Sequence, residues 1–134
     1  WDNLQAVIPG GSSMPLLPKK VCDSITMDFD SLIENKSGLG TAGIVVINKD
    51  QDIVECMARI ARFYKHESCG QCTPCRVGCE KAASIMETSD WDISLLEDLC
   101  EVMESSSICG LGQAATNPIK SSIMYFSEEI KSNG

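Results

Sequence analysis

The sequence lacks the features that mark a membrane-spanning, secreted or nucleic-acid-binding protein. No stretch approaches the roughly 18 consecutive apolar residues of a membrane span. The N-terminal WDNLQAVIPGG has neither the charged region nor the long apolar region of a secretory signal peptide. Lysine and arginine total 11 against 19 acidic residues, a formal net charge of −8, whereas nucleic-acid binding calls for basic patches. We therefore expect no membrane insertion, no nucleic-acid partner and a reducing, cytosol-like compartment.

An initiating methionine is also missing, since the first methionine is Met14. At 134 residues the chain has room for one domain, or for one domain and part of another. We expect it to be the C-terminal part of a longer protein. A chain of this size buries roughly two thirds of its unfolded surface, so it needs no covalent cross-links to fold. Its eight cysteines are therefore interpreted as metal ligands or core residues.

Two patterns divide the chain near residue 48. The part before it, 1–48, is rich in turn signals, and the apolar runs LQAVI (4–8) and GIVVI (43–47) predict two strands, the second of them buried. A short helix is predicted at 29–35. From residue 49 onward the apolar residues recur at three- and four-residue steps, as in amphipathic helices. The pattern indicates an α+β fold.

The helical part is predicted to contain four helices of three to four turns. They span residues 52–66, 74–88, 92–104 and 117–130. The loops between them are short, which favours a small four-helix bundle.

The densest chemical signal is the run C-x2-C-x2-C formed by Cys69, Cys72 and Cys75. Two-residue gaps let a tight loop present three thiolates to a common centre and leave backbone N–H groups beside it. A structural zinc site usually shows two separated cysteine pairs instead. The run therefore indicates an iron–sulfur cluster.

The fourth ligand is less evident from spacing. Cys79 completes C-x2-C-x2-C-x3-C, but in two-cluster ferredoxins the last cysteine of that run binds the other cluster and precedes a proline. Here Glu80 follows, and the sequence has no second run. Cys109 lies between two predicted helices, where Gly110 and Gly112 allow close backbone approach. We expect the distant Cys109 to be the fourth ligand, and Cys79 stays open as the alternative.

Other candidates receive simpler interpretations. Cys56 and Cys100 stand beside apolar helix positions and are predicted to be small core residues, while Cys22 is left unassigned. Residues 38–43 match G-x-G-x-x-G, but a dinucleotide site needs a strand before the motif and a helix after it. The predicted order is the reverse, so the motif does not indicate a nucleotide site.

The cysteine motifs carry a family resemblance. ESCGQCTPCR at 67–76, followed by ICGLG at 108–112, resembles the C-terminal region of the NADH-binding flavoprotein (51 kDa) subunit of respiratory complex I. VIPGGSSMPLLP at 7–18, MDFDSL at 27–32 and GLGTAGIVV at 38–46 are similar to the same subunit. The resemblance thus covers nearly the whole chain.

The resemblance implies an organisation in two parts. Residues 1–48 would be the end of a ubiquitin-like (SLBB) β-grasp domain, and residues 49–134 a helical domain that holds one [4Fe-4S] cluster. The cluster ligands would be Cys69, Cys72, Cys75 and Cys109.

The resemblance also implies a function. The chain would be an electron-transfer module of an NADH dehydrogenase, receiving electrons from reduced FMN and passing them to clusters in partner subunits of the twenty-four-kilodalton and seventy-five-kilodalton types. The family's FMN and NADH loops have no match here, so both cofactors would belong to a missing N-terminal domain, and the chain alone would not be catalytic. The parent would be peripheral, on the cytoplasmic side of a bacterial inner membrane or in the matrix of a mitochondrion or related organelle.

Two alternatives accompany this interpretation. ICGLGQAATNP at 108–118 is closer to the flavoprotein subunits of NAD(P)-linked hydrogenases and formate dehydrogenases, which would change the final electron acceptor. A structural zinc-binding interaction module, without redox activity, is the alternative of another class.

Overall fold

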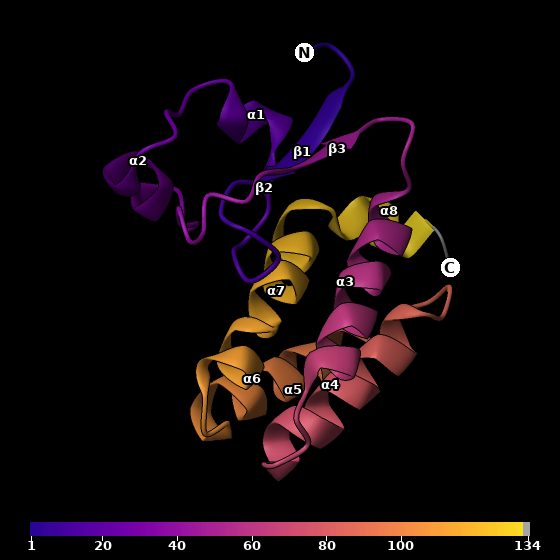
Figure 1. The fold of residues 1–134 in the computed structure, drawn as a ribbon. Helices are drawn as coiled ribbons and strands as arrows, with labels where there is room; N and C mark the ends of the chain where they lie inside the picture. The colour runs from indigo at the N-terminus through magenta and orange to yellow at the C-terminus, as the bar shows by residue number, and fades with distance from the viewer. Residues whose placement is uncertain (133–134) are drawn as a thin grey trace.

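The computed structural model describes residues 1–132 and places a small sheet at one end of a group of helices (Figure 1). The antiparallel sheet has the order β2-β1-β3, formed by Leu4–Ile8 (β1), Leu17–Pro18 (β2) and Val45–Asn48 (β3). Alternate residues of β1 are buried, as the period of two along a strand requires. The prediction of a strand at 4–8 is therefore confirmed.

The second predicted strand is displaced and differs in burial. It forms as β3, which begins two residues and ends one residue later than expected, and the prediction of a buried strand is wrong because Ile47 is the one buried residue of β3. Val45 and Val46 are exposed, and β3 is an edge strand, with β1 as its one neighbour within the described residues. A β-branched run has the same composition at an edge as in a sheet interior, so the sequence does not distinguish the two cases.

Two short helices connect the strands. Lys19–Cys22 (α1) was not predicted, whereas Phe29–Glu34 (α2) confirms the helix expected there. The Asp28 carboxylate caps α2 by accepting a hydrogen bond from the Ser31 backbone N–H at 2.8 Å. The segment 1–48 thus contains more helix than its turn-rich composition suggested.

Four longer helices follow, and each packs against the next to close a ring: α3 with α4, α4 with α5, α5 with α7, and α7 with α3. Their bounds are Ile53–Glu67 (α3), Thr73–Met86 (α4), Ile93–Ser106 (α5) and Thr116–Tyr125 (α7). The first three confirm the predicted helices to within two residues at each end. Within residues 1–132, no helix is long and apolar enough to cross a membrane.

The prediction for the C-terminal region differs from the structure in two respects. The segment before it, expected to be a loop, contains a short helix at Gly110–Ala114 (α6). The predicted helix itself breaks at Phe126, whose φ of −128° and ψ of 31° are not helical, and continues as Ser127–Ser132 (α8). Phe126 and Ile130 are both buried, so the break turns the end of the chain back onto the core.

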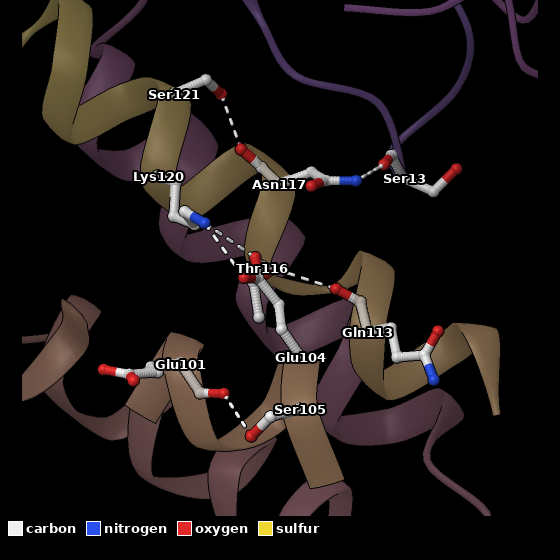
Figure 2. Close-up of polar contacts among 9 residues, drawn as sticks. All are labelled: Ser13, Glu101, Glu104, Ser105, Gln113, Thr116, Asn117, Lys120 and Ser121. Atoms are coloured by element: carbon white, nitrogen blue, oxygen red, sulfur yellow. Dashed lines mark hydrogen bonds and ion pairs between the residues drawn. The ribbon is translucent and has the colours of Figure 1, made fainter. Parts of the chain in front are cut away.

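The sheet and the helices share one apolar core, which includes Ala6 and Ile8 of β1 together with residues of α3, α4, α5, α7 and α8. Two hydrogen bonds between distant segments reinforce the contact. The Leu16 N–H donates to Ser121 Oγ at 3.0 Å. Asn117 Nδ2 donates to the Ser13 carbonyl at 2.7 Å (Figure 2). The loop after β1 is thereby held against α7.

A polar cluster links α5 to α7, the helices that precede and follow α6 along the chain. Glu104 on α5 accepts hydrogen bonds from Thr116 Oγ1 at 2.6 Å and from Lys120 Nζ at 3.0 Å, both on α7 (Figure 2). Thr116 Oγ1 also lies 2.9 Å from the Gln113 carbonyl oxygen of α6. Partial burial raises the pKa of the Glu104 carboxyl, but the hydrogen bonds from Thr116 and Lys120 outweigh it, and the pKa lies below its ordinary value.

Candidate metal centre

The turn between α3 and α4 carries Cys69 and Cys72, and Cys75 follows in the first turn of α4. Helix α3 ends where Ser68 becomes extended, and Gly70 then adopts φ +75°, in the left-handed region that favours glycine. Arg76, in the first turns of α4, donates a hydrogen bond to the Gly70 carbonyl and holds the turn closed. This turn and α6 both lie at the end of the helices remote from the sheet (Figure 1).

Cys72 occupies the N-cap position of α4, where the N–H groups of the first helical turn are unpaired. Backbone hydrogen bonds from Ile108 and then from Cys75 lower the pKa of its thiol, and the nearby Arg76 guanidinium adds to the effect. Ile108 belongs to the distant segment before α6, so the tertiary fold itself favours a thiolate at Cys72.

Cys75 lies one turn further into α4 and is buried. Its Sγ is 3.3 Å from Ser68 Oγ and 3.9 Å from Cys79 Sγ. Cys79 packs behind it, in an apolar cluster with Tyr64 and Met103. Burial, followed by the charge of the neighbouring Cys75, raises the pKa of Cys79 to about 12.

The second wall of the site comes from the segment before and within α6. Cys109 is the N-cap residue of this helix. A Cβ added at Gly112 would collide with Ser107 Oγ and lie 2.9 Å from Cys75 Cβ, so only glycine lets α6 approach α4 here. A Cβ at Gly110 would meet no atom of the described residues within 4 Å. The expected close approach is therefore confirmed at Gly112 and wrong at Gly110.

The two walls enclose a cavity of about 370 Å³. All four cysteines predicted as ligands line it, and its other lining residues are Glu67, Ser68, Gln71, Ile108 and Leu111. Cys79 does not line it. Spacing alone had left Cys79 and Cys109 as alternatives, and the fold places Cys109 at the cavity and Cys79 in the core behind it.

The other cysteines lie elsewhere. Cys100 is buried in the main core, and burial, followed by the charge of Glu104, raises its pKa to about 12, which confirms the prediction of a core residue. Cys56 is half-buried against the same core, and Cys22 ends α1. Neither of them lines the cavity.

The residues present fit a polynuclear cluster. Four thiols surround one cavity, a backbone amide already points at one of them, and thiolates are the donors that iron–sulfur clusters use. Among residues 1–132, no group of three or more Cys, His, Asp or Glu is arranged to hold a single metal ion as it stands. The four cysteines therefore line a wide cavity and do not converge on one ion-sized position. Ser107 Oγ, beside Gly112, is buried without a hydrogen-bond partner in the described part of the chain. No sequence signal pointed to Ser107, because a buried serine and an exposed serine cannot be distinguished in a sequence.

These features define a class: an α+β module with a cysteine-lined cavity suited to an iron–sulfur cluster. Residues 55–133 match the family described as "NADH-ubiquinone oxidoreductase-F iron-sulfur binding region". The chain belongs to this family, whose members bind a 4Fe-4S cluster, and the resemblance found in the sequence is confirmed.

Curated relatives bear related names. The chain is 47% identical to "NADH dehydrogenase [ubiquinone] flavoprotein 1, mitochondrial" of Dictyostelium discoideum, over 98% of this chain and 29% of that protein. It is 48% identical to a subunit of the NADH-quinone oxidoreductase of Rickettsia bellii, over 98% of this chain and 33% of that protein. The chain thus spans about a third of the length of these relatives, which are named as parts of oxidoreductases.

A solved structure has the same fold. The crystal structure of an NAD+-reducing [NiFe]-hydrogenase in the H2-reduced state superposes with a TM-score of 0.80 at 30% sequence identity, over 98% of this chain and 23% of that one. The mixed α/β architecture is thereby shared with an NAD+-reducing hydrogenase, while the similar sequences include those of NADH dehydrogenases.

Proposed function

We propose that this chain is the [4Fe-4S]-binding, electron-transfer module of an NADH dehydrogenase flavoprotein subunit. One observation carries the proposal: cysteines from two segments far apart in the sequence line a single cavity. Cys69, Cys72, Cys75 and Cys109 would hold the cluster, which when bound supplies reversible one-electron transfer.

The residues of the chain prepare the cavity for that group. The N-terminus of α4 and the Ile108 N–H favour negative charge at the Cys72 sulfur. Ile108 and Leu111 supply apolar surface to the cavity. Gly112 allows α6 to approach closely enough for Cys109 to reach the same space as the motif cysteines.

The parent protein would supply the rest of the electron path. Electrons would come from FMN reduced by NADH in an N-terminal domain and leave to clusters of twenty-four-kilodalton-type and seventy-five-kilodalton-type partners. The sheet, within residues 1–48, would end a ubiquitin-like domain, and α3, α4, α5 and α7 would form the four-helix bundle within residues 49–134. The parent would be peripheral, on the matrix or cytoplasmic side of its membrane, and the names of mitochondrial and bacterial relatives support a mitochondrial or bacterial setting.

A second candidate is the same module in an NAD-linked hydrogenase, which the similarity to a solved hydrogenase favours. The two differ in the electron acceptor of the complete enzyme. Quinone reduction by NADH in the assembled complex supports the first candidate, and hydrogen-dependent NAD+ reduction supports the second. A colourless protein that binds only zinc would contradict both.

The ligand set is tested by low-temperature EPR of the anaerobically reconstituted, reduced chain. We expect a [4Fe-4S] signal that persists in Cys79→Ser and is lost or converted in Cys109→Ser. Cys79→Ser is the matched control, since it makes the same change at a cysteine beside the cavity. If Cys79→Ser destroys the signal while Cys109→Ser retains it, the proposed ligand set is wrong.

A further inference from the structure

The Cys75 sulfur has two polar neighbours that come from different parts of its surroundings. Ser68, at the end of α3, approaches it from the cavity, which Ser68 also lines. Cys79 approaches it from the core, one helical turn further along α4. The distances to Cys75 Sγ are 3.3 Å from Ser68 Oγ and 3.9 Å from Cys79 Sγ, both within hydrogen-bonding range for sulfur.

The direction of these hydrogen bonds follows from the role of Cys75. In the free thiol, either partner in each contact is able to donate. A cysteine that binds a metal does so as a thiolate and has no proton to give. With Cys75 as a ligand, the Ser68 hydroxyl and the Cys79 thiol are therefore the only possible donors in their contacts.

Each donor is held in place by its surroundings. Ser68 Oγ accepts a hydrogen bond from the Gly70 N–H at 3.3 Å, which occupies an oxygen lone pair and leaves the O–H for Cys75. Cys79 is 2% exposed and packs with Tyr64 and Met103. Cys79 lies outside the cavity and is therefore not placed to bind the cluster as a thiolate, and as a thiol it can donate its S–H to the Cys75 sulfur 3.9 Å away.

We propose that Ser68 and Cys79 donate hydrogen bonds to the Cys75 sulfur of the bound cluster and thereby raise its reduction potential. This inference rests on the proposed function, because it takes Cys75 to be a cluster ligand. Reduction adds negative charge that is shared with the ligand sulfurs, so a donor to sulfur stabilises the reduced form more than the oxidised form. Both are positioning residues, acting on the cluster through Cys75.

The test is an EPR-monitored redox titration of the reconstituted full chain and its variants. We expect Ser68→Ala and Cys79→Ala each to lower the midpoint potential. The change in the reduction equilibrium constant should be about twofold to tenfold, where tenfold is about 59 mV for one electron. The shift should be larger for Ser68→Ala, because O–H is a stronger donor than S–H and lies closer. Ser68→Thr, which retains the hydroxyl, should restore the wild-type potential.

Cys100→Ala is the matched control, since Cys100 is buried equally deeply but lies in the main core. Its potential should equal that of the wild type. If Cys79→Ala does not retain the cluster, the isosteric pair Cys79→Thr and Cys79→Val replaces it, and the potential should be higher with Thr. Unchanged potentials in the Ser68 and Cys79 variants, with intact signals, would overturn this inference and leave the proposed function standing. Absence of a cluster from the wild type would instead contradict the proposed function.

Discussion

Helix α4 places cysteines in two opposite environments within two turns. Cys72, at its N-cap, receives backbone hydrogen bonds that lower its pKa, while Cys79, in the helix interior, has its pKa raised to about 12 by burial. Cys100 on α5 resembles Cys79, with a pKa of about 12 and burial as the main cause. The comparison separates two causes of a shifted thiol pKa: backbone donors at a helix N-terminus lower the pKa of Cys72, and burial in an apolar core raises the pKa of Cys79 and Cys100.

The largest expected effect is on thiol reactivity in the reduced, cluster-free chain. At neutral pH, a thiol with a pKa of about 12 has roughly a thousandfold smaller thiolate fraction than one at the ordinary value of 9.0. The greater nucleophilicity of a thiolate with a higher pKa offsets part of this difference, so iodoacetamide should modify Cys72 at least about thirtyfold faster than the buried Cys100. Mass spectrometry of peptides from a time course measures both rates.

The pH dependence provides a further check. Alkylation of Cys72 should reach half of its maximal rate below the ordinary thiol pKa of 9.0, whereas that of Cys100 should still rise with pH there, because a group with a lowered pKa ionises at lower pH. In denaturant the two rates should converge. Native rates within tenfold of each other would contradict the comparison.

A second, smaller effect concerns the wall that brings Cys109 to the cavity. Gly112→Ala would force a Cβ against Ser107 Oγ and Cys75 Cβ, and overpacking of this kind costs about 1 to 3 kcal/mol. We expect a lower midpoint in chemical unfolding and reduced cluster occupancy, measured by iron content. Gly110→Ala is the control from the same helix, where the added methyl meets no described atom and both quantities should stay at wild-type values. Equal losses in the two variants would show that helix α6 does not depend on this contact.

The smallest effect is expected at the polar cluster that holds α5 to α7. The folded-state pKa of Glu104 is lowered, so its contribution to stability is present above its unfolded value near 4.5 and is lost as the pH falls through the lower folded value. Because the ion pair with Lys120 is partly exposed, Glu104→Gln should cost under about 1 kcal/mol at pH 7. Thermal unfolding of both proteins from pH 7 to pH 3 should show the difference in Tm vanish at the acid end. A difference that grows toward low pH would refute this account.

Local patterns predicted much of the fold. Helices α3, α4 and α5 follow from the three- and four-residue spacing of apolar residues, and the turn before α4 follows from the spacing of its cysteines. Residue 126 shows where that approach fails. The apolar period continues through Phe126 and Ile130, but the chain bends there because burying both side chains requires it to fold back on the core.

Local sequence patterns also failed to predict that β3 is an edge strand and that α6 is helical. Whether a β-branched strand is an edge depends on which strands pair with it, and within the described residues β3 pairs with β1 alone. Helix α6 is too short to be stable by itself and forms between α5 and α7 because Gly112 lets it pack against α4.

By itself, the sequence determined that three closely spaced thiols gather where one helix ends and the next begins, because gaps of two residues keep them close together along the chain. Tertiary structure alone decided between Cys79 and Cys109 as the fourth cysteine at the cavity. Cys79 is near the motif along the chain, but the direction in which its side chain points is set by what packs on α4, and that face is covered by the core. Cys109 is remote in sequence and reaches the cavity because α5 and α6 fold back onto α4, a contact that no local spacing encodes.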